Sequence, residues 1–332
     1  MVKLHNKIAM IDLTNFEQQE KYNTDNFSWK YYKIMNKSNG TKHFAKVFKS
    51  FSENFNKRME TAFFNEILIN SKLNHPSIIK FIGYSLMDFK NRSKPVIILE
   101  YASNKLLEDY FYEESDLNIS NFSDTQKLII IYGIASGMSY LHSHDVIHRS
   151  LNPRNIFIDE FYHPKITDFD FAIEITDNYI QNERIQGFTL THELDYFAPE
   201  TLTSCKFSKF SDVYSFSLIM YQIFTNKKPF NSFIRKLGGF NDINERPTFD
   251  EPICDAYKNL IERCWSTDPQ LRPTLDQIIN ELKTNNEFIT DKIDKEEYFK
   301  YIRQLEEFPA SFESTNKIQI RKFKKNKKKI LI

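Results

Sequence analysis

VIHRSLNPRN, at residues 146–155, is the stretch that decides the fold of this chain, together with KITDFDF at 165–171 and YFAPE at 196–200. Before residue 102, short runs of β-branched, aliphatic and aromatic residues predict strands around one helix. Further along the chain, apolar residues recur at helical spacing over longer segments. The sequence therefore predicts an α+β protein with a small mixed lobe and a larger, mainly helical lobe.

Local signals place the individual elements. Apolar residues recur four apart from Phe55 to Ile67, which predicts a helix over residues 54–73 that ends before Pro76, because proline cannot continue a helix. Ser123 and Gln126 form the capping-box pattern that begins a helix. The other expected elements are strands at residues 30–35, 43–49, 78–84 and 96–101, a turn at 37–40, and helices at 212–224, 252–264, 274–283 and 294–307.

Composition excludes several classes of protein. The 332 residues include 45 Lys and Arg against 44 Asp and Glu, so the balance gives no reason to expect nucleic acid as the main partner. The three cysteines form no C-x-x-C pair, which excludes a disulfide scaffold and a cysteine zinc site and favours a reducing compartment. The apolar runs are too short to span a membrane, and the first residues lack the apolar stretch of a secretory signal. We therefore expect a cytoplasmic protein.

Taken together, in this order and spacing, the three quoted stretches resemble the catalytic loop, the magnesium loop and the end of the activation segment of eukaryotic protein kinases. LNHPSIIKFIGY at 73–84, and Cys264-Trp265 followed by LRPT at 271–274, resemble the tyrosine-kinase-like branch. The resemblance implies a two-lobed protein kinase domain over residues 20–285. The parts it implies are an N-terminal extension at 1–19, a small lobe at 20–101, a large lobe at 102–285, and a charged helical segment with a basic tail at 286–332.

The resemblance implies several retained parts of a kinase site. Lys46 matches the lysine that holds nucleotide phosphates, and Glu66 matches its ion-pair partner on the helix. Asn155 and Asp168 match the two magnesium ligands, whose hard oxygen donors suit that cation. Two further nucleotide contacts follow from the resemblance, at Glu100 and Ala102. From the residues alone, a structural ion pair at Lys46 and Glu66, and loop-ordering hydrogen bonds at Asn155 and Asp168, stay open as alternatives.

Three residues depart from the family's catalytic pattern. Ser150 stands where the catalytic aspartate belongs, and a hydroxyl is not an appreciable base near neutral pH. Asn152 replaces the lysine that neutralises charge on the transferring phosphoryl group. Glu193 falls where the family usually has a threonine that bonds to the catalytic loop. The sequence therefore predicts lost or strongly impaired phosphoryl transfer.

The nucleotide-binding positions are altered as well. Registering on Gly40 places TDNFSW, at residues 24–29, over the phosphates, with Thr24, Asn26 and Trp29 at the glycine positions and Asp25 adding a like charge. Glycines are needed there because backbone N–H groups must approach phosphate closely. The chain has only seven glycines, in keeping with this loss.

Two aromatic residues fall in the adenine pocket by this register. Phe44 stands where the family has a small alanine, and Tyr31 replaces the valine that closes the pocket. If the strands keep this register, both rings fill the space of adenine; a slip by one residue would turn them elsewhere. Mg-ATP is the cofactor implied by the family, and we expect weak or absent binding.

The resemblance implies that the structural parts of the large lobe are retained. His148 and Phe169 match packing positions, Asp212 matches the residue that braces the catalytic loop, and Glu200 and Arg272 match a buried ion pair. Three other positions differ from the family or bear on regulation. Asp170 adds a carboxylate beside Asp168, which either repels phosphate or adds a metal ligand, and Asn70 replaces an apolar packing residue on the helix. Arg149 is either a structural hydrogen-bond donor or a dock for a phosphorylated Thr189 or Thr191.

We interpret the chain as a pseudokinase that acts through protein–protein contacts. The alternatives are an active or weakly active Ser/Thr kinase of the tyrosine-kinase-like type, with Asp170 as an unconventional base, and a switch that binds ATP without turnover. The tail at 317–332 carries eight basic residues and no acidic ones. It is either a solvated end, a contact for an anionic membrane, or a signal for an import receptor.

Overall fold

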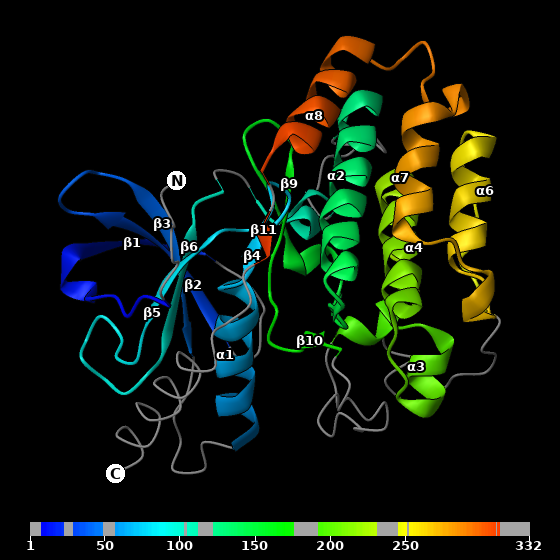
Figure 1. Cartoon of the computed structure of the whole chain (residues 1–332). Coiled ribbons are helices and arrows are strands. Elements are labelled where there is room, and N and C mark those ends of the chain that lie inside the picture. The colour runs from blue at the N-terminus through cyan, green and yellow to red at the C-terminus, as the bar shows by residue number, and fades with distance from the viewer. Residues whose placement is uncertain are drawn as a thin grey trace. The chain divides into compact units, whose positions relative to one another are not determined.

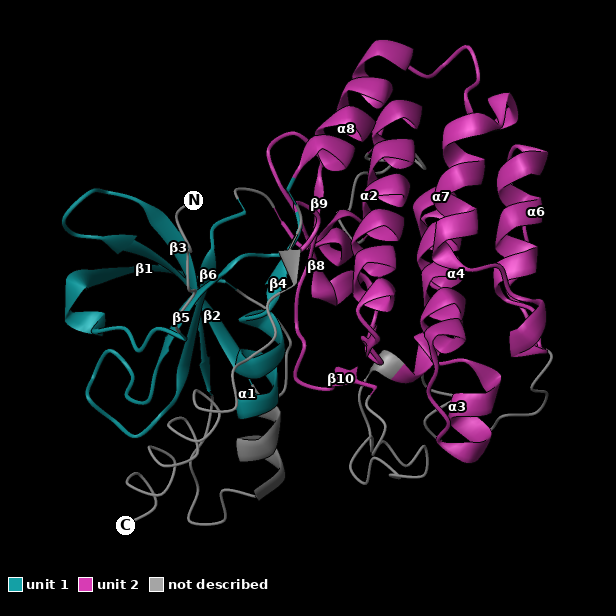
Figure 2. Cartoon of the chain, viewed as in Figure 1, with its two compact units in different colours: residues 1–75, 79–102, 309–332 teal, residues 76–78, 103–308 magenta. Residues whose placement is uncertain are grey.

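The computed structural model of the chain describes residues 8–22, 29–48, 57–102, 105–111, 122–175, 192–230, 245–250, 252–309 and 311–312. These residues divide into two compact units (Figure 2). Unit 1 contains residues 1–75, 79–102 and 309–332, and unit 2 contains residues 76–78 and 103–308.

Unit 1 is built on a five-stranded antiparallel sheet with the strand order β1-β2-β3-β6-β5 (Figure 1). A long helix, α1, accompanies the sheet. The bounds are β1 Phe16–Tyr22, β2 Trp29–Asn36, β3 Lys42–Phe48, α1 Lys57–Asn70, β4 Leu73–Asn74, β5 Phe81–Ser85 and β6 Val96–Glu100.

The pairing of β2 with β3 determines which side chains share a face of this sheet. Tyr31 lies opposite Lys46, and Lys33 lies opposite Phe44. Because side chains alternate along a strand, Phe44 and Lys46 point to one face, while Ala45 and Val47 point to the other. The two strands and their turn, with Gly40 at a φ of +70°, lie where the sequence predicts them.

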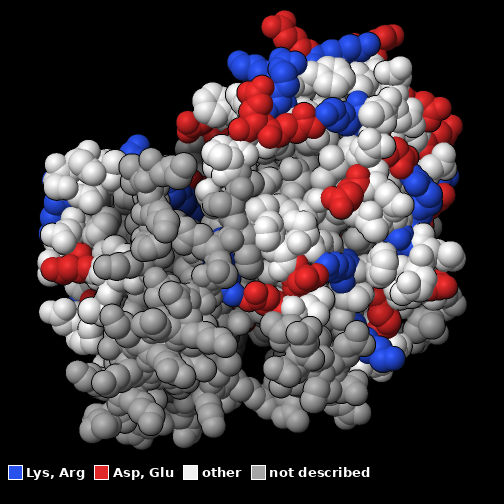
Figure 3. Space-filling model, in the orientation of Figure 1, with Lys and Arg blue, Asp and Glu red and all other residues white. Residues whose placement is uncertain are grey.

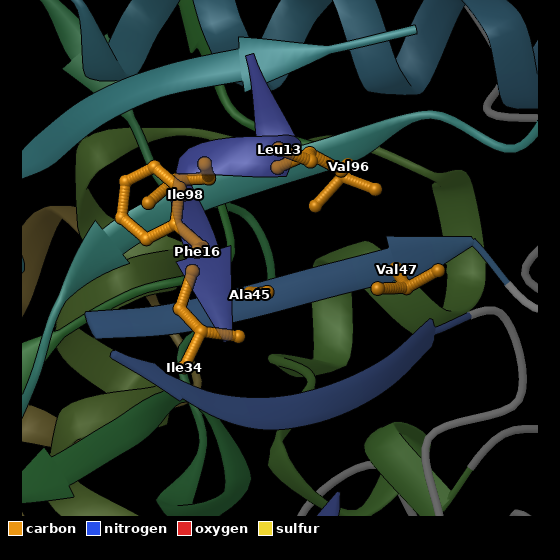
Figure 4. Packing of buried hydrophobic residues seen from close by; sticks show 7 residues of the cluster. All are labelled: Leu13, Phe16, Ile34, Ala45, Val47, Val96 and Ile98. Atoms are coloured by element: carbon orange, nitrogen blue, oxygen red, sulfur yellow. The ribbon is translucent and has the colours of Figure 1, made fainter. Parts of the chain in front are cut away.

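The face of the sheet that carries Ala45 and Val47 is closed by the first described residues of the chain. Leu13 and Phe16 are each 8% exposed and pack with Ile34, Ala45, Val47, Val96 and Ile98 (Figure 4). Ahead of them, Ile11 N donates to Tyr84 O at 2.7 Å, and Tyr84 N donates to Ala9 O at 3.0 Å. The segment expected as a separate extension at 1–19 thus contributes residues 8–19 to the core and edge of unit 1.

Unit 2 is mainly helical, as the sequence predicts. Its longest helix, α2, begins after Ser123, which forms the expected capping box with Gln126. The helices are α2 Asp124–Ser143, α3 Pro199–Ser204, α4 Lys209–Thr225, α6 Asp255–Cys264, α7 Leu275–Thr284 and α8 Lys295–Glu307, with short strands β7 Val146–Ile147, β8 Ile156–Ile158, β9 Pro164–Ile166 and β10 Ile173–Glu174.

Several element boundaries differ from the prediction: α1 begins at Lys57 rather than 54, α4 at Lys209 rather than 212, and α6 at Asp255 rather than 252. The strand expected at 78–84 begins only at Phe81, because the residues before it pair elsewhere: Ser77 O accepts from Ile166 N at 2.8 Å, and Ile78 bridges to Ile166. Helix α1 ends at Asn70 rather than 73, since Leu73 and Asn74 pair with β11, Ser311–Phe312.

All three cysteines carry free thiols. In the part of the chain that is described, no helix is long and apolar enough to cross a membrane.

Candidate nucleotide and catalytic site

Lys46 and Glu66 form a buried ion pair inside unit 1. Lys46 lies on β3, and its Nζ contacts Glu66 Oε1 at 2.9 Å and Oε2 at 2.7 Å. Glu66 lies on α1, and both side chains are fully buried. The two residues therefore lie together as the resemblance implies, and the two charges satisfy each other in a site without water around the side chains.

The ring of Trp29 covers the same ammonium group. Lys46 Nζ lies 4.5 Å from the centroid of the Trp29 ring, within the range of a cation–π contact. Trp29 is 2% exposed and packs edge-on against Phe48 and, at 6.3 Å, near Phe63. The residue at the last glycine position of the expected phosphate loop is thus a bulky side chain placed over the lysine.

Phe44 occupies the same face of the sheet, two residues before Lys46. Its ring is fully buried between Tyr22, at 5.1 Å, and Tyr101, at 4.9 Å. The hydroxyl oxygens of these two tyrosines lie 3.4 Å apart. Tyr31 is 5% exposed on this face as well. Phe44 and Tyr31 are therefore buried on the face of the sheet that carries Lys46, so a strand slip that turns them to solvent is excluded.

The strand that follows carries the two further positions expected to touch nucleotide. Glu100 N donates to Lys80 O at 2.8 Å, and the Glu100 carboxylate accepts from Lys80 N at 3.0 Å. Ala102 is 2% exposed. Both residues flank Tyr101, whose ring packs on Phe44.

One buried amide on α1 has no hydrogen-bond partner among the described residues. Asn70 is 1% exposed, and within the described part of the chain neither its Nδ2 nor its Oδ1 has a partner. It lies one turn after Glu66 on the same helix, at the position where the resemblance implies an apolar residue. A buried polar group without a partner destabilises the folded state.

In unit 2, the Asp212 carboxylate organises the loop at 146–155. It accepts from His148 N and Arg149 N, each at 2.9 Å, and lies 2.9 Å from His142 Nε2. Asp212 lies in the first turn of α4 and is 1% exposed. Arg149 adopts a φ of +69°, an unfavourable conformation for a side-chain-bearing residue that these bonds hold in place.

His148 is a buried neutral imidazole. Burial lowers its pKa below the usual value, with the nearby Asp212 opposing that change. Its Nε2 donates to Thr167 O at 3.1 Å, and its Nδ1 accepts from Ser150 N at 3.4 Å. The ring also packs on Phe169 at 5.1 Å. The packing roles expected for His148 and Phe169 fit these contacts.

Ser150 lies inside a network of amides. Its carbonyl oxygen accepts from Asn155 Nδ2 at 2.7 Å and Asn152 Nδ2 at 2.9 Å, and its hydroxyl accepts from Asn155 Nδ2 at 3.2 Å. Asn152 Oδ1 accepts from Arg154 N at 2.9 Å, so this side chain orders the loop rather than carrying a charge. The loop at 148–155 contains no carboxylate that could take the place of a catalytic base.

Asn155 and Asp168 are the residues that could hold a metal ion. Thr167 N donates to Asn155 O at 2.9 Å, which ties the segment after β9, on which Asp168 lies, to this loop. Asp168 is 4% exposed and adopts a φ of +68°. Across the described ranges, no group of three or more His, Cys, Asp or Glu side chains could hold a metal. One carboxylate and one amide oxygen remain, which fit a magnesium ion only if phosphate supplies further ligands.

The ion pair expected between Glu200 and Arg272 is present. Arg272 Nη1 and Nη2 bind the two carboxylate oxygens of Glu200 at 2.7 and 2.9 Å, and Arg272 also donates to the carbonyl oxygens of Phe210 and Ser266. The side chain of Arg272 is fully buried. This pair joins the start of α3 to the segment before α7.

The comparison with known families agrees with this arrangement. Residues 17–282 match the family described as protein tyrosine and serine/threonine kinase. The chain belongs to the protein kinase family. The two-lobed α+β kinase fold expected from the sequence is confirmed, with an antiparallel sheet in the first part and a larger helical part after it.

Several kinases are similar to this kinase domain. Dual specificity protein kinase pyk3 of Dictyostelium discoideum is 29% identical over 224 residues, covering 67% of this chain and 16% of that protein. Serine/threonine/tyrosine-protein kinase HT1 of Arabidopsis thaliana is 29% identical over 238 residues, covering 70% and 57%. A putative serine/threonine-protein kinase/receptor, R831, of Acanthamoeba polyphaga mimivirus is 30% identical over 232 residues, covering 69% and 13%. The chain thus spans less than two thirds of these relatives.

Some predicted positions of the kinase site lie outside the described residues. Thr24, Asp25 and Asn26 of the expected phosphate loop are among them, as are Thr189, Thr191 and the side chain of Glu193. Of the residues beside them, Asp170 is half-buried, and the guanidinium of Arg149 lies 4.6 Å from the Phe207 ring and is mostly buried. These predictions stay predictions.

Sequence reasoning missed the partners that hold Phe44. Tyr22 and Tyr101 were not singled out, although β1 and β2 pair Tyr22 with Tyr31 and thereby place Tyr22 on the same face. The signal that could have revealed Tyr22 is a strand that begins at residue 16, before the expected start of the kinase domain at residue 20. The cation–π contact of Trp29 was also not predicted. Replacement of a glycine by tryptophan indicates that backbone contacts to phosphate are lost, but it does not indicate which side chain the new ring will contact.

Proposed function

We propose that this chain is a pseudokinase of the tyrosine-kinase-like branch that acts through contacts with other proteins in the cytoplasm. The observation that carries the proposal is the aromatic cluster Tyr22, Phe44 and Tyr101. Protein kinases generally use Mg-ATP, and the base of the nucleotide packs against the sheet face on which Phe44 lies. In this chain the face is already filled by its own side chains.

The energetics of this cluster favour exclusion of the nucleotide. To admit adenine, the ring of Phe44 must leave two aromatic neighbours, and a large buried side chain contributes about 1.5–3 kcal/mol through burial alone. Protein interiors pack too densely to admit a further ring without such a movement. The nucleotide therefore binds only if its own contacts exceed this cost.

The phosphate contacts available to offset that cost are reduced. The Trp29 ring covers the ammonium group of Lys46, so a triphosphate must displace this ring to reach the lysine. Ordering a flexible triphosphate has an entropic cost of its own. The occupied sheet face and the covered lysine therefore both weaken the binding of Mg-ATP.

The catalytic loop supports the same proposal independently of binding. Ser150 accepts hydrogen bonds from an amide and has no carboxylate beside it within its loop. A positioned general base contributes ~10²–10⁴-fold to a proton-transfer step. Even with Mg-ATP bound, phosphoryl transfer is expected to be slower by that factor.

A switch that binds ATP without turnover is the second candidate. It is favoured by the intact Lys46–Glu66 pair and by the retained oxygens of Asn155 and Asp168. An active kinase that uses Asp170 as its base is the third candidate. It requires the nucleotide to displace the aromatic cluster, and it requires Asp170 to accept the substrate proton in place of a carboxylate at residue 150.

We test the proposal by titrating Mg-ATP against the full chain and the Phe44→Ala variant, with thermal unfolding as the readout. The unaltered chain should show no rise in Tm at millimolar Mg-ATP, since a ligand at 100 times its Kd stabilises a fold by about 2.7 kcal/mol and would be seen easily. Phe44→Ala opens the face and should show a rise, despite a lower starting Tm.

Val47→Ala is the matched control for this experiment. Val47 is buried on the same strand but on the opposite face of the sheet, so its removal destabilises the sheet without opening the Phe44 face. It should show no rise in Tm with Mg-ATP. A clear rise in the unaltered chain, which Phe44→Ala reduces, would mean that the ring supports the nucleotide, and the proposal would be withdrawn.

A further inference from the structure

The helix α8 and the strand β11 lie beyond the region that matches the kinase family, which ends at residue 282. Helix α8 buries Tyr298, Tyr301, Ile302 and Leu305 and lies along α2 in unit 2 (Figure 1). Its opposite side is charged: Figure 3 shows acidic and basic side chains mixed over this end of the face in view. One side of the helix is thus built for contact with unit 2.

Tyr301 is the centre of this contact. Its ring stacks on His163 at 4.1 Å, and its hydroxyl lies 3.5 Å from Ser77 Oγ. Gly133 of α2 makes room for the phenol, because a Cβ at that position would overlap the Tyr301 hydroxyl and lie 2.6 Å from Pro164 Cγ. The ends of α8 are fixed too, by Asp294 N donating to Thr125 Oγ1 at 2.8 Å and by the ion pair of Lys283 with Glu306.

Strand β11 follows α8 after residues 308–310 and pairs within unit 1. Ser311 lies opposite Asn74, and Phe312 lies opposite Leu73. The paired residues come directly after α1, whose last turn continues into them: Ser71 N donates to Ile67 O and Lys72 N donates to Ile69 O, each at 3.0 Å. Ile67 is the residue next to Glu66.

We propose that residues 294–312 form a brace that holds the turn after α1, and through it the helix end that carries Glu66. The brace contacts residues 73–74 through β11 and Ser77 through Tyr301, so one short stretch of chain is held from both of its ends. Each contact lies within a single unit, and the connection between the two contacts is the covalent chain itself. Release of β11 is the step that frees α1 while α8 stays in place.

The test measures hydrogen exchange of the full chain at the amides of residues 66–70, which β11 does not pair with. A Ser311→Pro/Phe312→Pro variant removes the N–H donors of β11. It should raise exchange at residues 66–70 by about tenfold or more and leave α7 unchanged, since local opening lowers protection only in the unit that opens. Asn316→Pro/Lys317→Pro, further along the same tail, is the matched control and should change nothing at these amides.

A second variant acts from the other end of the brace. Gly133→Ala displaces Tyr301 and should raise exchange in α8 and at residues 66–70 together. If the double proline variant changes exchange only at residues 73–74, or if Gly133→Ala loosens α8 and leaves residues 66–70 unchanged, α1 is held independently of this segment and the proposal is wrong.

Discussion

At the scale of single residues, the site combines retained partners with replaced chemistry. Asp212 accepts from the backbone amides of His148 and Arg149, and Asn155 Nδ2 donates both to the carbonyl oxygen and to the hydroxyl of Ser150. These bonds maintain the loop whether or not a carboxylate is present. The hydrogen bonds that order this loop therefore do not depend on a carboxylate at residue 150.

His148 gives a prediction about pH. Its pKa is lowered in the folded state because burial disfavours the charged form, so the unfolded chain binds a proton more readily. The resulting stability is present above the unfolded value of about 6.5 and is lost as the pH falls through the folded value. The free energy of unfolding should therefore decrease below about pH 6.5, and His148→Asn should flatten this decrease when denaturant unfolding is measured at several pH values.

If the free energy of unfolding depends on pH with the same slope in His148→Asn and in the unaltered chain, other titrating groups cause the decrease and the prediction for His148 is wrong. His43 and His163 are the comparison, because burial lowers their pKa values as well. Each is only partly buried, so replacement of either by Asn should alter the slope less than replacement of His148.

Asn70 gives a prediction about stability. Both polar atoms of its amide lack a partner while the side chain is 1% exposed. An unsatisfied buried polar group costs about 1–3 kcal/mol. Asn70→Leu, of similar size, should raise the free energy of unfolding by that order in a denaturant titration, whereas Asn70→Ala should gain less because it leaves a cavity. A loss of stability in Asn70→Leu would mean that the amide has a role that these contacts do not reveal.

At the scale of elements, the retained ion pair of Glu200 joins α3 to the segment before α7. Glu200→Ala leaves the fully buried guanidinium of Arg272 without its carboxylate partner, with only the carbonyl oxygens of Phe210 and Ser266 as acceptors, and loss of such a charge partner typically costs about 3–5 kcal/mol. Arg263 and Glu281 form the matched pair, with side chains 46% and 28% exposed. Glu281→Ala should cost less than about 1 kcal/mol. Equal losses of unfolding free energy in the two variants would contradict a structural role for the buried pair.

The sequence predicted elements well where the signal was local. The capping box at Ser123 and Gln126 begins α2 as expected, and the register of β2 and β3 follows from the turn at Gly40 and the burial of Tyr31 and Phe44. The sequence failed where the partner was distant along the chain. The local pattern predicts a helix as far as residue 73, because nothing near residues 73–74 shows that residues 311–312 pair with them.

In the candidate site, too, the contacts that local motifs indicate were predicted, and those between residues distant in the sequence were not. The Lys46–Glu66 and Glu200–Arg272 pairs came from motifs, since each residue occupies a fixed place in its stretch. Tyr22 and Tyr101 are 79 residues apart in the sequence and meet on Phe44 only after the sheet forms. Contacts of this kind depend on strand order, which a single sequence does not give.

At the scale of the whole molecule, the fold is that of a protein kinase, and the differences concentrate on the nucleotide and the base. The Lys46–Glu66 and Glu200–Arg272 pairs are intact, the sheet face of Phe44 is filled by aromatic side chains, and Trp29 covers Lys46. The basic tail at 317–332 lies outside the described residues, so its role at a membrane or an import receptor stays a prediction.

Phosphoryl transfer by the purified full chain tests the central claim most directly. Incubated with Mg-ATP labelled on the γ-phosphate, the chain should incorporate no more label into itself or a general protein substrate than Lys46→Ala does. Ser150→Asp should not restore transfer, because the residues of a catalytic site act as a unit and their effects are not additive. Incorporation by the unaltered chain that Lys46→Ala abolishes would contradict the account.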